Sequence, residues 1–363
     1  MSTKIRVGIL FGGKSAEHEV SLQSAKNVAE AIDKEKYDVA LIGIDKTGRW
    51  LLPNQSRFLL NASDPKLIAM NREDEESVTL VPQSGGDLTD VAAGGTHSSV
   101  SVIFPILHGP FGEDGTVQGM LKLAGVPFVG AGVLGSAVGM DKDVMKRLLR
   151  DAGIPIARFL VFRRGDAVDF DTVSDALGLP FFVKPANMGS SVGVQKVSDE
   201  ASFGQAIENA FAYDTKVLIE EFVEGRELEC SVLGNAKPMA SVIGEILPSH
   251  EFYSYEAKYI DEQGAGLEIP ADISDNVSDA IRDLAIRTFQ VLECEGLGRV
   301  DCFLKADGEV IVNEINTIPG FTKISMYPRL WEASGISYSD LINRLIELAL
   351  ERFEREQTLK TSY

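Results

Sequence analysis

The sequence predicts an α/β unit followed by α+β units, and three observations lead to this prediction. The chain has 363 residues, which is enough for two or three domains. Strand and helix patterns alternate over the first part of the chain, as in a parallel sheet with ligand groups at its carboxyl edge. Long strands dominate from about Gly225 onward. We expect three units, over 1–130, 131–220 and 221–363.

The composition limits the partners and the compartment. A formal net charge of −19 argues against nucleic acid or an anionic membrane as the partner, because both require a basic surface. The three cysteines show no CxxC spacing, which is typical of buried thiols in a reducing compartment. The longest uncharged run, 124–140, contains a proline and five glycines and predicts strands and turns rather than a membrane span. The N-terminus shows no secretory signal, so we expect a cytoplasmic protein.

The first strand and helix are indicated by their periodicity. Residues 5–11 (IRVGILF) predict a strand, Gly12 and Gly13 a turn, and Ser21 the N-cap of a helix. The apolar stripe of that helix consists of Leu22, Ala25, Val28 and Ile32.

Two further strands are expected in the N-terminal domain. They are YDVALIGID (37–45) and VSVIFPILHG (100–109), the latter ending at His108. The polar, weakly periodic segment of about 60–97 is expected to be a surface insertion.

The second half of the chain begins with a well-marked helix. MDKDVMKRLLRDAGIP predicts a helix capped by Asp141 and ended by Gly153. Four strands are expected next, at FLVF, PFFVKP, VGVQKV and KVLIEEFV, with a helix over 199–212 before the last. A helix over 277–293, a hairpin and a C-terminal helix from Ser339 complete the prediction.

A phosphate-loop signature at the N-terminus lies in the wrong context. GILFGGKS, from Gly8 to Ser15, matches G-x-x-x-x-G-K-S. That motif requires its first glycine to open a loop after a strand, whereas Gly8 lies inside the predicted strand. A tight turn at Gly12 and Gly13 is the better interpretation.

A lysine at a strand end precedes a loop rich in donors. Lys184 ends the strand FVKP, and residues 187–193 (NMGSSVG) follow, whose N–H groups and hydroxyls could fold over phosphates. Alternatively, Lys184 extends into solvent and the loop is a mobile hairpin. Downstream, Glu220, Glu221 and Glu227 could contact an adenine and a ribose, or be surface acids on an edge strand.

A hairpin over 298–320 carries the strongest chemical signal. Asp307-Gly308 favours a two-residue turn, which pairs 306 with 309, 304 with 311, Asp301 with Glu314 and Arg299 with Asn316. Facing carboxylates repel unless a divalent cation lies between them, with Asn316 as a further oxygen ligand. The alternative is a solvated face on which Arg299 neutralises both acids. The expected core face of the hairpin comprises Val300, Cys302, Leu304, Ile311 and Ile315.

Six segments in order resemble the D-alanine–D-alanine ligases of the ATP-grasp superfamily. They are HGPFGEDGTVQG, MDKDVMKRLLRDAG, FVKPANMGSSVGV, YEAKY, GRVD and NEINTIPGFT, and they span nearly the whole chain. The resemblance implies a substrate-binding domain over 1–130, a central ATP-grasp lid domain over 131–220 and a catalytic ATP-grasp domain over 221–363, with ATP held between two antiparallel sheets. It also implies two Mg²⁺ (or Mn²⁺) ions per site and a homodimer. It implies ligation of two D-alanines through a D-alanyl phosphate, for peptidoglycan precursor synthesis.

The resemblance also implies roles for individual residues. The implied nucleotide-binding residues are Lys142, Lys184, Gly189, Ser190, Ser191, Glu220, Glu221, Val223, Glu227, Lys258, Asn313 and Glu314. The implied metal ligands are Asp301, Glu314 and Asn316. The implied substrate-binding residues are Glu17, His108, Arg299, Gly320, Ser325 and Met326. In the implied mechanism, Ser190, Tyr259 and Glu17 form a hydrogen-bonded triad, Arg299 and the Gly320 N–H form the oxyanion site, and Ser325 receives the second substrate.

Three rival functions follow from the same residues. The nearest is a D-alanine–D-lactate ligase or another ATP-grasp carboxylate–amine ligase; Tyr259 in the loop 250–263 favours the dipeptide. A kinase that uses Lys14 is disfavoured by the position of Gly8. A non-catalytic nucleotide-binding regulator would have to lose metal-ligand residues that are present here.

Overall fold

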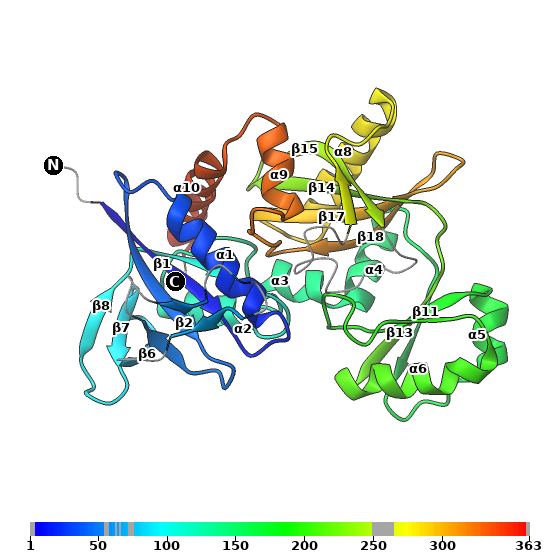
Figure 1. Ribbon diagram of the computed structural model, residues 1–363, viewed down its shortest axis with the longest axis horizontal. Coiled ribbons are helices and arrows are strands. Elements are labelled where there is room, and N and C mark those ends of the chain that lie inside the picture. The colour runs from blue at the N-terminus through cyan, green and yellow to red at the C-terminus, as the bar shows by residue number, and fades with distance from the viewer. Residues whose placement is uncertain are drawn as a thin grey trace.

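The molecule has three units, one at one end of its long axis and two at the other end (Figure 1). The computed structural model describes residues 4–53, 58–61, 64, 67–71, 76–248 and 265–360. Figure 1 shows the N-terminal sheet on the left, a small sheet with two helices at the lower right and a larger sheet at the upper right. The two sheets on the right face each other across a gap, and this pair positions the site described below.

The N-terminal unit contains a seven-stranded sheet in the order β8-β7-β6-β3-β2-β1-β9. Its strands are β1 (Ile5–Gly12), β2 (Tyr37–Ile44), β3 (Trp50–Leu52), β6 (Glu76–Leu80), β7 (Asp87–Asp90), β8 (Thr96–Ser99) and β9 (Val102–Ile106). Strand β1 pairs in parallel with β2 and β9, whereas β3, β6, β7 and β8 continue the sheet antiparallel. A separate two-stranded sheet joins β4 (Leu59–Leu60) to β5 (Ala69–Met70).

Two expectations for this unit are wrong. The segment of about 60–97, expected to be a surface insertion, instead supplies β6, β7 and the first half of β8, which extend the main sheet. Helix α1 (His18–Ala31) has Glu17 at its N-cap position, so Ser21 lies inside the helix. The Ser21 hydroxyl donates to the carbonyl of Ile106 and accepts from the N–H of Gly12 at 2.7 Å. This serine therefore ties α1 to β1 and β9 instead of capping the helix.

The glycine-rich turn after β1 has the expected form. Gly8 lies within β1, and Gly12 and Gly13 have φ values of +90° and +98°, which favour glycine. A Cβ on Gly12 would lie 2.2 Å from the carbonyl oxygen of Ile44. The Gly12-Gly13 turn is thus set by the close packing of β1 against β2. Farther along the chain, helix α2 (Thr116–Ala124) follows the carboxyl end of β9.

A pair of helices leads into the small sheet. Helices α3 (Val133–Met140) and α4 (Lys142–Asp151) are separated by Asp141, whose carboxylate caps α4 by accepting from the N–H of Val144 at 3.1 Å. The capping prediction is confirmed. Met145 and Leu149 of α4 belong to the hydrophobic core of the C-terminal sheet. Helix α4 therefore lies between the two sheets and can carry side chains to both.

The small sheet has four strands in the order β10-β13-β11-β12. They are β10 (Phe159–Arg163), β11 (Phe181–Pro185), β12 (Gln195–Val197) and β13 (Lys216–Glu221), close to the predicted positions. Helices α5 (Phe170–Leu177) and α6 (Glu200–Tyr213) cover one face, where Phe203 packs edge to face against Phe170 and Phe181. The other face looks toward the larger sheet (Figure 1).

The C-terminal sheet has five strands in the order β16-β15-β14-β17-β18. They are β14 (Arg226–Gly234), β15 (Met239–Pro248), β16 (Ala265–Glu268), β17 (Gly296–Leu304) and β18 (Val310–Asn316). The helices are α8 (Asp275–Val291), α9 (Met326–Ala333) and α10 (Tyr338–Gln357), which confirms the two helices predicted here. The three cysteines are free and buried in this unit, as expected of thiols.

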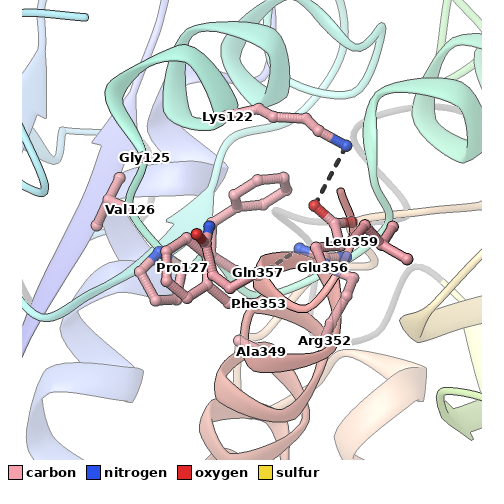
Figure 2. A pocket seen from close by; sticks show the side chains of 11 residues that line it. Lys122, Gly125, Val126, Pro127, Ala349, Arg352, Phe353, Glu356, Gln357 and Leu359 are labelled. Carbon is pink, nitrogen blue, oxygen red and sulfur yellow. Dashed lines mark hydrogen bonds and ion pairs between the residues drawn. The ribbon is translucent and has the colours of Figure 1, made fainter. Parts of the chain in front are cut away.

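Helix α10 fastens the C-terminal unit to the N-terminal one. The buried guanidinium of Arg352 donates to the carbonyls of Gly130 and Phe128 and lies 4.4 Å from the centre of the Phe128 ring. Figure 2 shows Lys122 of α2 pointing toward Glu356 of α10, an ion pair of 3.2 Å. These contacts make a fixed junction far from the gap between the two sheets. No helix in the described ranges is long and apolar enough to cross a membrane.

Candidate active site

A cavity of about 390 Å³ lies between the small sheet and the C-terminal sheet. Its walls come from β11, the loop after it, the β13–β14 connection and the hairpin β17–β18. Its ionisable lining residues are Lys142, Lys184, Glu220, Glu221, Glu224, Glu227, Glu229, Asp301 and Glu314. Most of the nucleotide-binding residues implied by the sequence therefore line one cavity, although they come from distant segments.

A buried carboxylate between two lysines lies at one wall of the cavity. Glu220 at the end of β13 forms ion pairs with Lys184 of β11 and with Lys146 of α4. Burial alone would raise the pKa of Glu220, but Lys146 and Lys184 hold that pKa below its ordinary value. Lys184 lies 12% exposed, so the alternative of a lysine extending into solvent is wrong. Lys146 was not predicted, because nothing in its local sequence distinguishes it from a surface helix lysine.

A third lysine, Lys142, links the loop after β11 to the hairpin β17–β18. Lys142, the first residue of α4, donates from Nζ to the carbonyl of Met188 at 2.8 Å. The same Nζ lies 3.4 Å from Oε2 of Glu314. A cation thus already stands beside one of the two acids that the sequence assigned to a metal.

The hairpin brings the expected acids together by a different route. Asp301 faces Glu314 and Arg299 faces Asn316, as predicted. The turn is longer, however: Lys305 N–H donates to Glu309 at 2.9 Å and Gly308 has a φ of +87°. Leu304 therefore pairs with Val310, so the predicted pairings of 306 with 309 and of 304 with 311 are wrong.

A bulge near the middle of the hairpin restores the predicted register. The pairing shifts between Asp301 and Cys302, which leaves Asn313 as the extra residue of β18. Beyond the bulge, Val312 rather than Ile311 packs in the core of this unit, a correction to the expected core face. The one-residue error in the turn and the bulge cancel at the site.

Three acids form a row across three neighbouring strands. Glu229 of β14 faces Asp301 of β17, which in turn faces Glu314 of β18. Arg299 contacts two of them: its Nε and Nη2 donate to Asp301 at 2.7 Å each, and Nε lies 2.9 Å from Glu229. Asn316 also donates to Asp301, at 2.9 Å. Glu229 was missed, although its two-residue spacing from Glu227 on a strand could have indicated a shared face.

The two sequence interpretations of this hairpin are both partly met. Arg299 does neutralise Asp301, as the solvated-face alternative supposed, but Glu314 is paired with Lys142 instead. Within the described part of the chain, no three His, Cys, Asp or Glu side chains are arranged to hold a metal ion by themselves. Any ion here would need further oxygen ligands, such as those of a bound phosphate.

The loop after β11 closes over the entrance and reaches the N-terminal unit. The hydroxyl of Ser190 donates to the carboxylate of Glu17, 173 residues away in sequence. Ser190 and Ser191 have φ values of +51° and +59°, which are uncommon for residues other than glycine. Asp214 holds the start of the loop by accepting from the N–H of Asn187 at 2.8 Å. Two of the three members of the implied triad are thus in contact.

The end of β9 contacts the C-terminal unit through a histidine and an acid. His108 is buried, and its Nδ1 lies 3.0 Å from the carbonyl oxygen of Ile318, so Nδ1 carries the proton. Burial lowers the pKa of His108, which favours the neutral ring. Glu113, which was not predicted, accepts from the N–H groups of Gly109 at 2.7 Å and Ile318 at 3.2 Å.

The segment after β18 places the remaining predicted residues. Gly320 is buried, and the next residue, Phe321, donates from its N–H to Ser24 of α1 at 3.3 Å. Ser325 precedes α9 and accepts from the N–H of Thr322 at 3.0 Å, so its hydroxyl is held in a local turn. Met326 is buried against Ile246 and Leu330, which gives it a packing role.

The far end of the cavity is suited to a flat ring. Phe182 and Phe303 lie in its lining beside Val223, Glu227 and Asn313. Glu221 is paired with Arg158 and Glu220 with two lysines, so neither carboxylate is directed to a ligand alone. Lys258 and Tyr259 lie outside the residues that the structure describes.

The arrangement defines an enzyme of the ATP-grasp class. Two antiparallel sheets enclose a cavity that has lysines on one wall, paired acids on the other and a glycine-serine loop across its entrance. Family models named "D-ala D-ala ligase N-terminus" and "D-ala D-ala ligase C-terminus" match residues 6–131 and 148–347. The chain belongs to the D-alanine–D-alanine ligase family.

Individual relatives agree with this assignment. The chain is 59% identical over 362 residues to a D-alanine–D-alanine ligase of Shouchella clausii, covering 99% of this chain and 98% of that protein. It superposes with a TM-score of 0.85 on the VanG D-Ala:D-Ser ligase of Enterococcus faecalis, at 35% identity over 96% of this chain and 100% of the other. A Bacillus anthracis D-alanine–D-alanine ligase complexed with ATP gives a TM-score of 0.72 at 28% identity, covering 97% and 99%.

Proposed function

We propose that this enzyme joins two D-alanine molecules into D-alanyl-D-alanine with ATP, releasing ADP and phosphate, for peptidoglycan precursor synthesis. One observation carries the proposal. The cavity joins a lysine-lined wall and a row of acids to a loop that reaches Glu17, as a phosphoryl transfer to a small carboxylate requires. The 59% identity to a ligase of this name over nearly the full length supports the choice of substrate.

The chemistry follows from the poor reactivity of a carboxylate. One oxygen of the first D-alanine carboxylate attacks the γ-phosphorus of ATP, and the bond to the β,γ-bridging oxygen breaks, which gives D-alanyl phosphate and ADP. The neutral amine of the second D-alanine then attacks the acyl carbon. The C–N bond forms, the C–O bond to phosphate breaks, and the amine loses a proton. Lys142 and Lys184 place the phosphates, and Glu17 pairs with the ammonium of the first substrate.

The oxyanion of the second step needs fixed donors. Arg299 lies 14% exposed beside the acids, and its guanidinium is held by Glu229 and Asp301. We assign Arg299 and the N–H of Gly320 to the oxyanion, and Ser325 to the carboxylate of the second substrate. The loop from Gly189 to Gly193 closes the site and excludes water, which would otherwise hydrolyse the acyl phosphate.

Two Mg²⁺ ions fit the donors present. Seven acidic side chains line the described cavity against two lysines, so a polyanionic nucleotide needs added positive charge. Asp301, Glu314 and Asn316 offer hard oxygen donors, and Mg²⁺ commonly combines one or two carboxylates with phosphate oxygens. Bound there, the ions would spread the negative charge of the transferring phosphoryl group. Mn²⁺ takes similar ligands and is expected to substitute.

The larger-scale assignments rest on the family. We propose domain boundaries near residues 130 and 220, with the small sheet acting as a lid over the nucleotide. We propose a homodimer, and we place the reaction in the cytoplasm, where ATP is available.

One structural relative suggests an alternative for the second substrate, D-serine in place of D-alanine. The VanG D-Ala:D-Ser ligase has the same fold at 35% identity, so the architecture alone does not select the second substrate. The test is to incubate the enzyme with ATP, Mg²⁺, D-alanine and an equal concentration of D-serine or D-lactate, at pH 6 and at pH 9. We expect D-alanyl-D-alanine as the main product by mass spectrometry, rising with pH as the free amine fraction grows. A mixed dipeptide or a depsipeptide as the main product would refute the choice of acceptor.

A further inference from the structure

A fully buried lysine stands behind the nucleotide cavity. Lys146 of α4 has no exposed side-chain surface and does not line the cavity, so it cannot touch a bound nucleotide. Its ammonium forms an ion pair with Glu220, whose side chain is 5% exposed. An unpaired ion in such a place is costly, and the two groups therefore need each other.

The same carboxylate holds a lysine that does line the cavity. Glu220 contacts Lys184 through Oε2 and Lys146 through Oε1. One anion between two cations leaves one net positive charge at this wall. Without Lys146, Glu220 would neutralise Lys184 one to one, and the wall facing the phosphates would carry no net charge.

We propose that Lys146 is a positioning residue for ATP, which acts through Glu220 so that Lys184 keeps its positive charge for the nucleotide phosphates. The inference rests on the proposed function, because it takes ATP as the substrate. The need for this charge is greatest here, since the other ionisable lining residues of the cavity are mostly acids. The charge of Lys142 alone does not supply this need, because Glu314 lies 3.4 Å from its Nζ and balances it.

The placement of α4 explains how one residue can do this. Met145 and Leu149 anchor the helix in the core of the C-terminal sheet, whereas Lys146 reaches β13 of the small sheet. The ion pair therefore links α4, which is packed on the C-terminal sheet, to β13 of the small sheet. It fixes the charge of the lysine and also the position of the strand that carries Glu220.

The test uses three variants and direct titration of ATP with Mg²⁺ by calorimetry. Lys146→Met removes the charge but keeps a long apolar side chain, and we expect the Kd of ATP to rise roughly ten- to a hundredfold. Lys146→Met with Glu220→Gln removes both charges, leaves Lys184 without an anion, and should recover most of the affinity. Arg150→Met removes a positive charge from an exposed position of the same helix and should change the Kd less than about threefold.

The outcomes separate this inference from the proposed function. Wild-type enzyme that does not bind ATP would refute the proposed function. Wild-type binding with an unchanged Kd in Lys146→Met would refute only the role of Lys146. A folded double variant that binds ATP as weakly as Lys146→Met would also refute it, because Lys184 then has no anion beside it and should carry its charge to the phosphates. If Lys146→Met does not fold, the double variant decides: wild-type affinity supports the role and weak affinity overturns it.

Discussion

The carboxylate of Glu113, on the loop after β9, accepts a hydrogen bond from the N–H of Ile318 at 3.2 Å, so the N-terminal unit holds the segment that carries Gly320. The carbonyl of Ile318, which belongs to the next peptide group, accepts from Nδ1 of His108 at 3.0 Å. Two residues of the segment after β9 thus hold the peptide groups on both sides of Ile318, two residues before the proposed oxyanion donor. Movement of the segment after β9 would displace the N–H of Gly320. Such a shift would slow the reaction, because catalysis depends on the exact position of the donor.

Glu113 makes stability depend on pH in a defined window. Burial and then the nearby Glu17 raise the pKa of Glu113 to about 8 from an ordinary value of 4.5. Between these values the folded protein binds more protons than the unfolded one, so the free energy of unfolding falls as pH rises. Glu113→Gln cannot titrate, and its melting temperature should fall less than that of the wild type between pH 5 and pH 9.

The amide of Glu113→Gln also loses one acceptor for a backbone N–H, which should cost about 1 kcal/mol at every pH. The readout is therefore the difference in slope and not the offset. Glu354→Gln, at an exposed position of α10, is the matched control and should run parallel to the wild type. Parallel curves for Glu113→Gln as well would contradict the prediction.

Glu314→Gln tests the proposed metal site. The change keeps the shape but removes one charge from the row of acids, and it also removes the anion beside Lys142. Turnover at saturating ATP should fall at least about a hundredfold, with a higher Mg²⁺ requirement. The melting temperature should change little, because the side chain is 26% exposed. The control is Glu309→Gln in the exposed turn of the same hairpin, and equal loss in both variants would argue against a metal role.

Lys184→Ala and Lys14→Ala separate two possible phosphate sites. Lys184 lines the cavity next to Glu220, whereas Lys14 is exposed after the Gly12-Gly13 turn. We expect Lys184→Ala to weaken ATP binding roughly tenfold or more, because a charge-assisted contact is lost. Lys14→Ala should bind ATP as the wild type does. Nucleotide titrations that rank the two variants in the reverse order would revive the phosphate-loop interpretation of residues 8–15.

Glu229→Gln tests whether this acid positions Arg299. With a cation on Asp301, the guanidinium is repelled, and Glu229 is the remaining acid within 2.9 Å of its Nε. The variant should slow dipeptide formation about tenfold or more and release more than one phosphate per dipeptide, because the acyl phosphate waits longer for the second step. Glu229→Asp keeps the charge, and its ratio of phosphate released to dipeptide formed should stay closer to one. A ratio of one in Glu229→Gln, measured by parallel phosphate and dipeptide assays, would exclude this role.

Many of the elements and the chemistry of the hairpin could be predicted from local sequence. The N-cap at Asp141, the strands at 181–185 and 216–221 and the pairing of Asp301 with Glu314 follow from local signals: a capping side chain, apolar runs and alternation along a strand. Even so, the pairing was reached through a turn that is one residue too short. A bulge at Asn313, which no local pattern announces, corrects that error.

Which side chains come into contact depends on tertiary packing. The exchange of Ile311 for Val312 in the core and the position of Ser21 inside α1 depend on neighbouring strands, not on the residues beside them in sequence. Glu113 is hydrogen-bonded to Ile318, 205 residues away in sequence, and Ser190 is hydrogen-bonded to Glu17, 173 residues away. From local sequence Lys146 would be interpreted as a surface lysine, whereas in the fold it is buried in an ion pair with Glu220 of β13. Periodicity reports which face of an element is buried, whereas the charge of a buried group is settled by the particular ion that folding places against it.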